Sequence, residues 1–246
     1  MTGKDKKVAI VTGASRGIGA AIAARLAKDG FAVIVNHAGS AAAAEALVAK
    51  IVQNGGTASA FQADVSDPAA VAAMFDKTEA LHGGIDVLVN NAGIMTLAKI
   101  AEAGDELFDR HMAINVKGTF NALREAARRL RPGGRIVNLS SSQAALLHPT
   151  YGVYAATKAA VEAMTRVLAK ELRGRNITVN AVAPGPTATA LFLEGKPQDA
   201  IDRFSRLAPL ERLGTPEDVA NAVSFLVGPD GAWINGQVLR ANGGII

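Results

Sequence analysis

The feature that most constrains this chain is a glycine-rich turn that follows a short, almost wholly apolar run. Val8–Thr12 has the pattern of a buried strand, and Gly13, Gly17 and Gly19 lead from it into an alanine-rich helical stretch. Gly13 allows a tight turn, Gly17 lets the backbone approach a pyrophosphate, and Gly19 lets the helix pack on the strand. The free N–H groups at the start of that helix also favour phosphate. A glycine triplet alone can be an ordinary turn, but this position predicts a dinucleotide-binding α/β fold.

The rest of the chain repeats the same alternation of short apolar runs and longer helical stretches. Near-continuous apolar runs are typical of parallel strands covered on both faces. We expect strands at Val8–Thr12, Ala32–Asn36, Ala58–Gln62, Asp86–Asn90, Arg135–Ser140, Ile177–Ala183 and Gly236–Arg240, and helices at Ile18–Lys28, Ala41–Asn54, Pro68–His82, Asp105–Leu130, Tyr151–Arg173 and Pro216–Val227. This predicts one domain over residues 1–246, an α/β fold with a Rossmann-like, doubly wound, parallel seven-stranded sheet flanked by helices on both faces. The irregular residues 188–215 are either a substrate flap or an ordinary helical insertion.

Composition excludes several classes of protein. The chain has no cysteine, which excludes a disulfide scaffold, a cysteine zinc site and thiol catalysis. Its net charge of +4 comes from scattered residues and its aromatic content is 4%, so no nucleic-acid partner is expected. No stretch approaches the roughly 20 apolar residues of a membrane span, and the N-terminal run is too short for a signal peptide. No His, Asp or Glu group has metal-ligand spacing. We therefore expect a cytoplasmic protein without a metal or a membrane partner.

A second pattern lies at the end of the fifth expected strand and the start of the next helix. Tyr154 and Lys158 are four residues apart and share one helix face. An ammonium about 5 Å from a phenol, at an effective dielectric near 20, lowers the tyrosine pKa by about two units. Ser141 ends the strand, where its hydroxyl can hydrogen-bond a carbonyl oxygen. The pattern predicts acid–base chemistry at a carbonyl, and the spacing of 13 residues to Tyr154 favours Ser141 over Ser140 and Ser142.

The end of the second expected strand bears on the choice of cofactor. NAD sites usually present an Asp or Glu there, whereas this chain has Asn36, His37 and then Ser40. Without that carboxylate a 2′-phosphate is tolerated, and Arg16 and Ser40 would bind it. We therefore expect NADP(H) rather than NAD(H). The alternative is that Arg16 is an ordinary surface residue and Ser40 caps the next helix.

Together these motifs resemble the short-chain dehydrogenase/reductase family, in its single-domain branch of about 250 residues. The likeness covers essentially the whole chain. It rests on Thr12-Gly13-Ala14-Ser15-Arg16-Gly17-Ile18-Gly19, Asp64-Val65, Asn90-Asn91-Ala92-Gly93, Asn115, Ser141, Tyr154 with Lys158, Pro184-Gly185, Asn235-Gly236-Gln237 and Gly243-Gly244. The resemblance implies reversible, NADPH-dependent reduction of a ketone or aldehyde to an alcohol.

The resemblance also implies residue roles. Tyr154 would be the general acid and base, Lys158 would hold the nicotinamide ribose and lower the tyrosine pKa, and Ser141 would polarise the carbonyl. Asn115 would support a water-mediated proton relay. The implied cofactor contacts are Gly13, Ser15, Arg16, Gly17, Ile18, Gly19, Asn36, His37, Ser40, Asp64, Val65, Asn91, Ala92, Gly93, Tyr154, Lys158, Pro184, Gly185, Thr187 and Thr189. By position, Met95, Gln143, Leu146, His148 and Phe192 are candidates for the substrate pocket, with core packing as the alternative, whereas His82 and His111 are expected to be surface or packing residues.

Within the family, the nearest well-known group is the β-ketoacyl-acyl carrier protein reductases, which dock an acidic carrier through basic residues near the site mouth. Arg131 and Arg175 stand at such positions, but Gln143–Tyr151 and Val153 depart from that group's pattern. We therefore favour a carbonyl reductase acting on a small molecule and keep the carrier-linked reductase as the alternative. A non-catalytic NADP-sensing protein is a third, remote reading. The resemblance further implies a homotetramer built by the two longest expected helices and the C-terminal strand.

Overall fold

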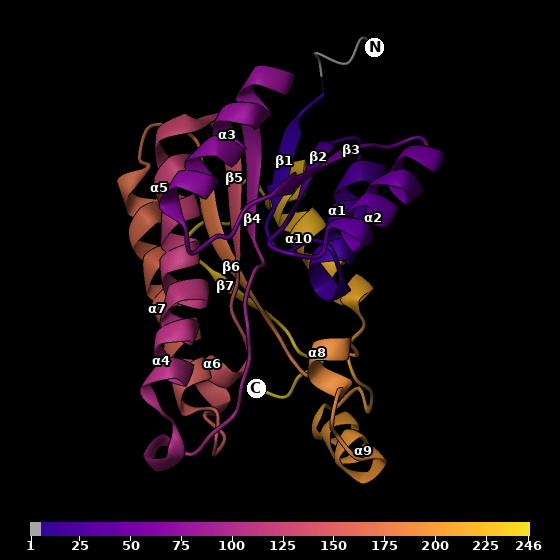
Figure 1. The fold of residues 1–246 in the computed structure, drawn as a ribbon, viewed down its shortest axis with the longest axis vertical. Coiled ribbons are helices and arrows are strands. Elements are labelled where there is room, and N and C mark those ends of the chain that lie inside the picture. Colours follow the sequence, from indigo (N-terminus) through magenta and orange to yellow (C-terminus); the bar gives the residue numbers. More distant parts are fainter. Residues whose placement is uncertain (1–5) are drawn as a thin grey trace.

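Seven parallel strands form one sheet at the centre of the molecule (Figure 1). The structure is a computed structural model and describes residues 6–246, so the first five residues of the N-terminal segment examined for a signal peptide lie outside the described part. The strands are β1 (Val8–Val11), β2 (Ala32–His37), β3 (Thr57–Gln62), β4 (Ile85–Asn90), β5 (Leu130–Leu139), β6 (Thr178–Pro184) and β7 (Val238–Ala241). Their order in the sheet is 3-2-1-4-5-6-7. The predicted α/β fold class is confirmed.

Helices cover both faces of this sheet. The main helices are α1 (Gly17–Lys28), α2 (Ala41–Gln53), α3 (Pro68–His82), α4 (Asp105–His111), α5 (Gly118–Arg129), α7 (Gly152–Glu171) and α10 (Pro216–Val227). One apolar cluster joins α1, α2 and α10 to the sheet, and the other joins α3, α5 and α7. In β1, Ala9 and Val11 belong to the first cluster and Ile10 to the second. Successive side chains of a strand point to opposite faces, which is why every residue of β1 is apolar and buried.

Local sequence explains where several helices begin and end. Asp67 accepts a hydrogen bond from Ala69 N at the start of α3, and Gly83 ends that helix with a φ of 76°. Thr215 and Asp218 form a capping box at the start of α10. These signals are local, so the predicted bounds of α3 and α10 agree with the structure.

The helix predicted over Asp105–Leu130 is not one regular helix. Between α4 and α5, residues Met112–Lys117 form a π-helix, η2, and Leu130 is already the first residue of β5, where it pairs with Ile85 of β4. Single π-helical turns are rare and occur often at functional sites. This one contains Asn115, so the interruption displaces a predicted site residue from the regular helical surface.

The segment 188–215 contains two short helices, α8 (Ala190–Leu193) and α9 (Gln198–Leu207). It is fixed at its base by a parallel bridge between Thr187 and Gly214, and neither helix has a buried residue. Figure 1 shows both helices extending beyond the end of the sheet. The segment is therefore partly helical, and the choice between a substrate flap and an ordinary helical insertion stays open. Three further short elements were not predicted: α6 (Gln143–Leu146), η1 (Ile100–Glu102) and η3 (Pro229–Gly231).

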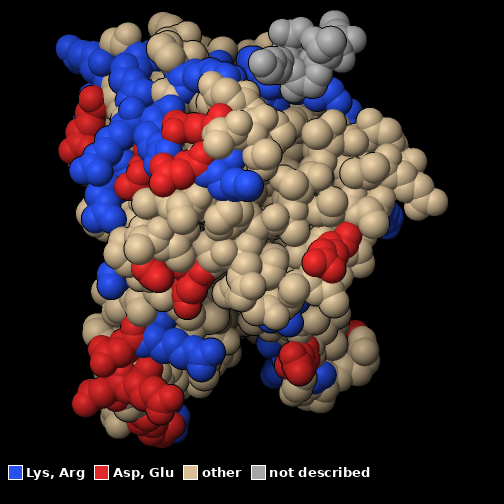
Figure 2. Space-filling model, turned by 45° about the horizontal axis from the view of Figure 1, so that its top comes forward, with Lys and Arg blue, Asp and Glu red and all other residues tan. Residues whose placement is uncertain are grey.

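Basic side chains gather at the end of the molecule where α5 and α7 finish (Figure 2). There Arg129 binds the carboxylates of Asp76, Glu79 and Glu125. These carboxylates raise the pKa of Arg129 above its usual value. The ion pairs of Arg129 with Asp76 and Glu79 therefore join α5 to α3, so this positive charge has a structural role.

The described residues contain neither a membrane-spanning helix nor a group of side chains arranged to bind a metal. No helix within residues 6–246 combines the length and apolar character that a membrane span requires. Over the same residues, no group of three His, Asp or Glu side chains is arranged to hold a metal ion. The expected cytoplasmic location stays a prediction.

Candidate active site

The predicted site residues converge at the carboxyl ends of the strands. The strand order reverses between β1 and β4, and in open α/β sheets ligands bind in the crevice at such a point. The glycine turn follows β1, Asn91 follows β4, Ser141 lies two residues after β5, and Gly185 follows β6. Residues far apart in the sequence thus meet at the edge of the sheet where folds of this kind have their ligand crevice.

All three glycines of the turn are required, for different physical reasons. Gly13 and Gly17 have φ values of 60° and 57°, in the left-handed region that favours glycine. A Cβ on Gly13 would also lie 2.8 Å from the Cα of Ala92. Gly19 has an ordinary helical backbone, but a Cβ there would lie 2.4 Å from Nδ2 of Asn91. Gly19 therefore makes room for Asn91, rather than only for the helix to pack on the strand.

The side chain of Asn36, near the end of β2, holds the glycine turn in place. Its Oδ1 accepts a hydrogen bond from Gly13 N at 3.1 Å, and its Nδ2 donates to the carbonyl oxygens of Ala63 at 3.0 Å and Phe61 at 3.3 Å. The residue is 1% exposed. The amide group therefore joins the turn to the chain that follows β3, and the predicted contact between Asn36 and the cofactor stays a prediction.

Asn91 and Thr12 lock the same turn to β4. Asn91 Nδ2 donates to the carbonyl oxygens of Thr12 and Gly13, both at 2.9 Å. Thr12 Oγ1 accepts from the backbone N–H groups of Asn91 at 3.0 Å and Ala92 at 3.1 Å. Thr12 was recognised as part of a motif but not as a site residue, since its partners come from a strand about 80 residues later.

The residues expected near a 2′-phosphate differ in exposure: Arg16 and Ser40 are exposed, whereas His37 is buried. Arg16 is exposed in an extended backbone just before α1. Ser40 is exposed and its side chain does not cap α2, so the capping alternative is wrong. His37 is 5% exposed, and its Nδ1 has no hydrogen-bond partner among residues 6–246. The exposed carboxylate of Asp64 accepts hydrogen bonds from Ser66 N and Oγ, both at 2.8 Å.

Ser141, Tyr154 and Lys158 come together beside Gly93. The Ser141 hydroxyl lies close enough to the Tyr154 phenol to lower its pKa, and Lys158 Nζ lies 5.7 Å from the centre of the Tyr154 ring. Lys158 is 5% exposed and donates a hydrogen bond of 2.8 Å to the carbonyl oxygen of Leu139. A Cβ on Gly93 would lie 3.5 Å from Lys158 Nζ. The predicted combination of a serine, a tyrosine and a lysine is thus present in three dimensions.

The pKa of the phenol differs from the expectation. Burial raises the pKa of Tyr154 to about 12, and the nearby Ser141 hydroxyl only partly opposes this. Burial also lowers the pKa of Lys158 to about 8. The expected lowering by the Lys158 ammonium does not dominate, because desolvation is the larger influence on both groups in this arrangement.

Asn115 and His111 fasten the loop after β4 to the helix that carries them. Asn115 Oδ1 accepts from Ile94 N at 2.8 Å, and its Nδ2 donates to Ile94 O at 3.0 Å and Thr157 Oγ1 at 3.1 Å. His111 Nδ1 donates to Leu107 O and its Nε2 accepts from Thr96 N. His111 is 1% exposed, which agrees with packing rather than surface as the expected alternatives. Asn115 at Ile94 and His111 at Thr96 together fix the backbone on both sides of the pocket candidate Met95.

The chain after β6 forms the opposite side of the crevice. Gly185 packs closely on Asn242, where a Cβ would lie 2.9 Å from the Asn242 Cα. Thr187 is buried and donates to Gly185 O, and Thr189 caps α8 by accepting from Phe192 N. A Cβ on Gly17 would lie 3.6 Å from the Thr189 methyl group. The base of segment 188–215 therefore lies directly against the glycine turn. Of the other expected contacts, Val65 is buried, whereas Ser15, Ile18 and Pro184 are partly exposed.

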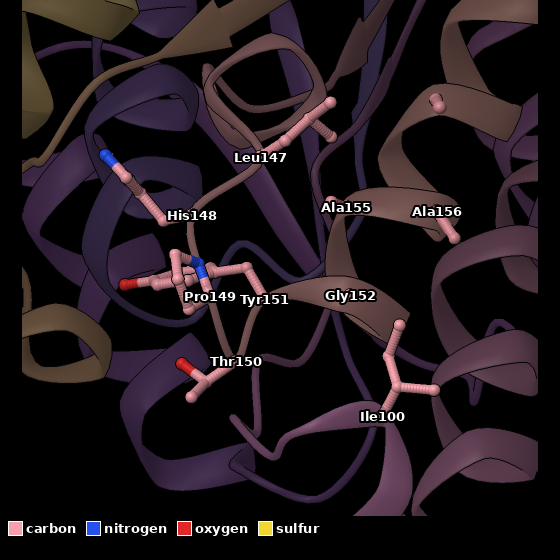
Figure 3. Close-up of a pocket in the computed structure, with 10 residues that line it drawn as sticks. Ile100, Leu147, His148, Pro149, Thr150, Tyr151, Gly152, Ala155 and Ala156 are labelled. Carbon is pink, nitrogen blue, oxygen red and sulfur yellow. The ribbon is translucent and has the colours of Figure 1, made fainter.

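The pocket candidates do not all line one cavity. A cavity of about 410 Å³ lies beside the N-terminus of α7, and His148 is the only one of the five that lines it (Figure 3). Gln143 is buried and bonded to His148, and Leu146 is partly exposed. Phe192 packs against Phe204 of α9, with ring centres 5.2 Å apart.

The basic positions considered for carrier docking lie away from this crevice. Arg131 is at the amino end of β5, where it pairs with Asp86 at 3.2 Å. Arg175 precedes β6, and its guanidinium donates to the carbonyl oxygens of Ala127 and Leu130. The expectation that they line the mouth of the site is wrong, because parallel strands place their amino ends opposite the reactive end.

Comparison with known proteins agrees with this geometry. A family model described as enoyl-(acyl carrier protein) reductase matches residues 13–246. A short-chain type dehydrogenase/reductase from Picea abies is 47% identical, covering 97% of this chain and 92% of the relative. A chloroplastic NADPH-dependent aldehyde reductase-like protein from Arabidopsis thaliana is 44% identical, covering 98% and 94%.

A solved short-chain dehydrogenase from Burkholderia cenocepacia, in complex with NADP, is 42% identical and superposes with a TM-score of 0.92 over 97% of each chain. The sequence motifs, the strand order and these likenesses agree over nearly the full length. The chain belongs to the short-chain dehydrogenase/reductase family of NAD(P)-dependent oxidoreductases.

Proposed function

We propose that this protein reduces a ketone or aldehyde of a small molecule to an alcohol with NADPH, in a reversible reaction. The observation that carries the proposal is the meeting of Ser141, Tyr154 and Lys158 beside a glycine turn suited to a pyrophosphate. The Arabidopsis relative is named as NADPH-dependent, and the Burkholderia structure contains NADP.

The residues present fit an NADP(H) cofactor. Gly13 and Gly17 supply a turn without side chains, at the start of a helix whose free N–H groups favour phosphate. Arg16 and Ser40 are exposed on either side of the end of β2, and the orphaned Nδ1 of buried His37 is a further polar group there. Asp64 and Val65 would flank the adenine, and Pro184, Gly185 and Thr189 would hold the carboxamide end. Lys158 would bind the nicotinamide ribose.

The protein's side chains would polarise the substrate carbonyl and supply the proton that it takes up. When bound, NADPH supplies the hydride that reduces the carbonyl carbon. Ser141 donates a hydrogen bond to the carbonyl oxygen, and Tyr154 transfers its phenolic proton to that oxygen as the C=O double bond becomes a C–O single bond. The positive charge of Lys158 would stabilise the phenolate left behind. Asn115 holds the wall of the site, and its part in a proton relay stays a prediction.

The test is oxidation of NADPH, followed by absorbance, over a panel of ketones, aldehydes, sugars and diketones, with NADH in parallel. We expect turnover with NADPH and a lower kcat/KM with NADH. Absence of turnover with every carbonyl compound, in a protein that binds NADPH, would instead support a sensing role.

A carrier-linked β-ketoacyl reductase is the second candidate; the description of the matching family model supports it only in the carrier linkage, because that description names an enoyl reductase. Arg131 and Arg175 do not support it, because they lie at the amino ends of the strands and bind partners within the chain. The discriminating measurement compares a β-ketoacyl thioester on its acyl carrier protein with a simple ketone. A much higher kcat/KM for the carrier substrate would replace the first candidate.

We also propose a homotetramer. Phe108, Phe120 and Val167 are exposed on α4, α5 and α7, and Trp233, next to the C-terminal strand, is 98% exposed. Exposed aromatic side chains of this size are typical of protein interfaces. Light scattering that gives four times the chain mass supports the assembly, and a monomer mass rejects it.

A further inference from the structure

The loop between Ser141 and Tyr154 contains a pair of polar side chains that the mechanism above does not use. Gln143 Nε2 and His148 Nδ1 are 3.0 Å apart, and His148 N lies 3.3 Å from Gln143 Oε1. Gln143 is buried at 8% exposure, and its backbone N–H donates to Ser141 Oγ at 3.2 Å. The inference drawn from this pair rests on the proposed reductase function and concerns its substrate.

The pair fixes the tautomer of His148. The backbone N–H of His148 can only donate, so the group that it meets on Gln143 must be the amide oxygen. The amide nitrogen of Gln143 therefore donates to His148 Nδ1, which must carry no proton. The ring proton of the neutral imidazole is then on Nε2. Within the described residues, this Nε2–H donates to no other group.

Backbone strain in the same loop indicates that its shape is maintained for a reason. Leu147 and Thr150 have φ values of 53° and 74°, in a region that non-glycine residues rarely adopt, least of all a β-branched threonine. The conformation is held by the Gln143–His148 pair and by a hydrogen bond of 3.1 Å from Ala98 N to Thr150 O.

In the strained loop, the side chains of His148 and Tyr151 point in the same direction. Figure 3 shows the His148 ring and the Tyr151 hydroxyl pointing the same way, while Leu147 and Ile100 lie on the other side of the loop. His148 and Tyr151 have ring centres 6.4 Å apart, and Tyr151 and Tyr154 have centres 6.3 Å apart. A row of three rings thus connects the Nε2–H donor with the reacting phenol.

We propose that His148 is a specificity-determining residue whose Nε2–H, set by Gln143, binds a second oxygen of the substrate. The preferred substrates are carbonyl compounds that carry a hydroxyl or a further carbonyl several bonds from the reacting group. A hydrogen bond of this kind contributes about three- to tenfold to binding.

The test uses methyl ketones of increasing chain length, each paired with the same ketone carrying a terminal hydroxyl. In the wild type, the ratio of kcat/KM for the hydroxylated over the plain ketone should rise about three- to tenfold at one chain length. His148→Leu should return that ratio to one, Gln143→Met should lower it, and His148→Gln, which keeps an N–H donor, should restore part of it. Leu147→Ala changes an exposed side chain of the same loop and should leave the ratio unchanged.

Two outcomes overturn the inference while leaving the reductase function intact. One is turnover of the ketones with no hydroxyl preference at any chain length. The other is a His148→Leu protein that loses activity on both members of each pair by the same factor, which is what a purely structural role produces. Failure to reduce any ketone would instead count against the reductase function.

A readout that does not need turnover tests the tautomer directly. Imidazole nitrogen NMR shifts of the wild type, assigned with His148→Leu, should show the Nε2–H form for His148, and Gln143→Met should give a mixture of tautomers. An Nδ1–H tautomer in the wild type would overturn the inference.

Discussion

Two regions border the candidate active site and differ in how they are built. The ends of β1, β2 and β4 are joined by side chains that bond to backbone groups of distant segments, among them the buried Asn36 and Asn115 and the partly exposed Asn91. Segment 188–215 has two helices without a buried residue, and it is attached through the Thr187–Gly214 bridge and the capping box at Thr215. The first region is fixed by many cross-links, and the second by few.

This difference suggests that the first region fixes the geometry of proton transfer, whereas segment 188–215 moves to admit and release ligands. Groups that transfer protons must hold their geometry closely, which a set of satisfied buried hydrogen bonds provides. A segment with few buried contacts has a low cost of local opening and can move as ligands enter and leave. The four predictions below test whether the two regions respond differently, in order of decreasing effect.

The largest effect is expected for Tyr154→Phe. Loss of the phenolic proton donor should lower kcat/KM by about 10²- to 10⁴-fold, because general acid catalysis has that magnitude. The fold should be retained, since only one oxygen is removed. Steady-state kinetics together with thermal unfolding measure both quantities, and undiminished activity would contradict the assigned role.

The next effect concerns the buried lysine and pH. Because burial lowers the pKa of Lys158 from 10.5 to about 8, the unfolded chain binds more protons than the folded protein between these pH values. The free energy of unfolding of the wild type should therefore rise with pH across this window, relative to Lys158→Met, by up to about 3 kcal/mol. Urea unfolding at several pH values measures it, and a difference that is independent of pH would show that the lysine is not desolvated.

A smaller effect is expected at the glycine turn. Gly19→Ala places a methyl group against Asn91 Nδ2 and the Gly13 carbonyl oxygen, and should lower the free energy of unfolding by about 1–3 kcal/mol. Gly39→Ala is the matched control, because a Cβ there meets nothing within 4 Å. Equal stability of the two variants in denaturant titrations would mean that the turn relaxes more easily than its cross-links indicate.

The smallest effect on stability is expected in segment 188–215. Phe204→Ala removes the edge-to-face contact with Phe192 and should cost about 1 kcal/mol. Since Phe192 is a pocket candidate, and its backbone N–H bonds to Thr189 near Gly17, the same variant should also change KM for the substrate. A loss of stability above that of Gly19→Ala would reverse the proposed contrast between the two regions.

The sequence predicted those features that depend on neighbours along the chain. The apolar run of β1, the proline and glycine at the ends of α3, and the spacing of Tyr154 and Lys158 each need only local information. The π-helix around Asn115 was not predictable in this way, because the loop at Ile94 and a threonine on α7 hold that side chain. The structural bonds of Asn36 were not predictable either, because its partners after β1 and β3 come from other parts of the sequence.

The sequence alone thus determined the class of fold, the glycine turn and the spacing of the candidate catalytic side chains, because alternation, backbone freedom and helical spacing are local properties. The tertiary structure decided which polar groups remain free for ligands, where the arginines lie relative to the site, and the direction in which the pKa of Tyr154 moves. These depend on burial and on partners brought together by the sheet. Burial affects every group in the site together, and it cannot be predicted from the spacing of residues along the chain.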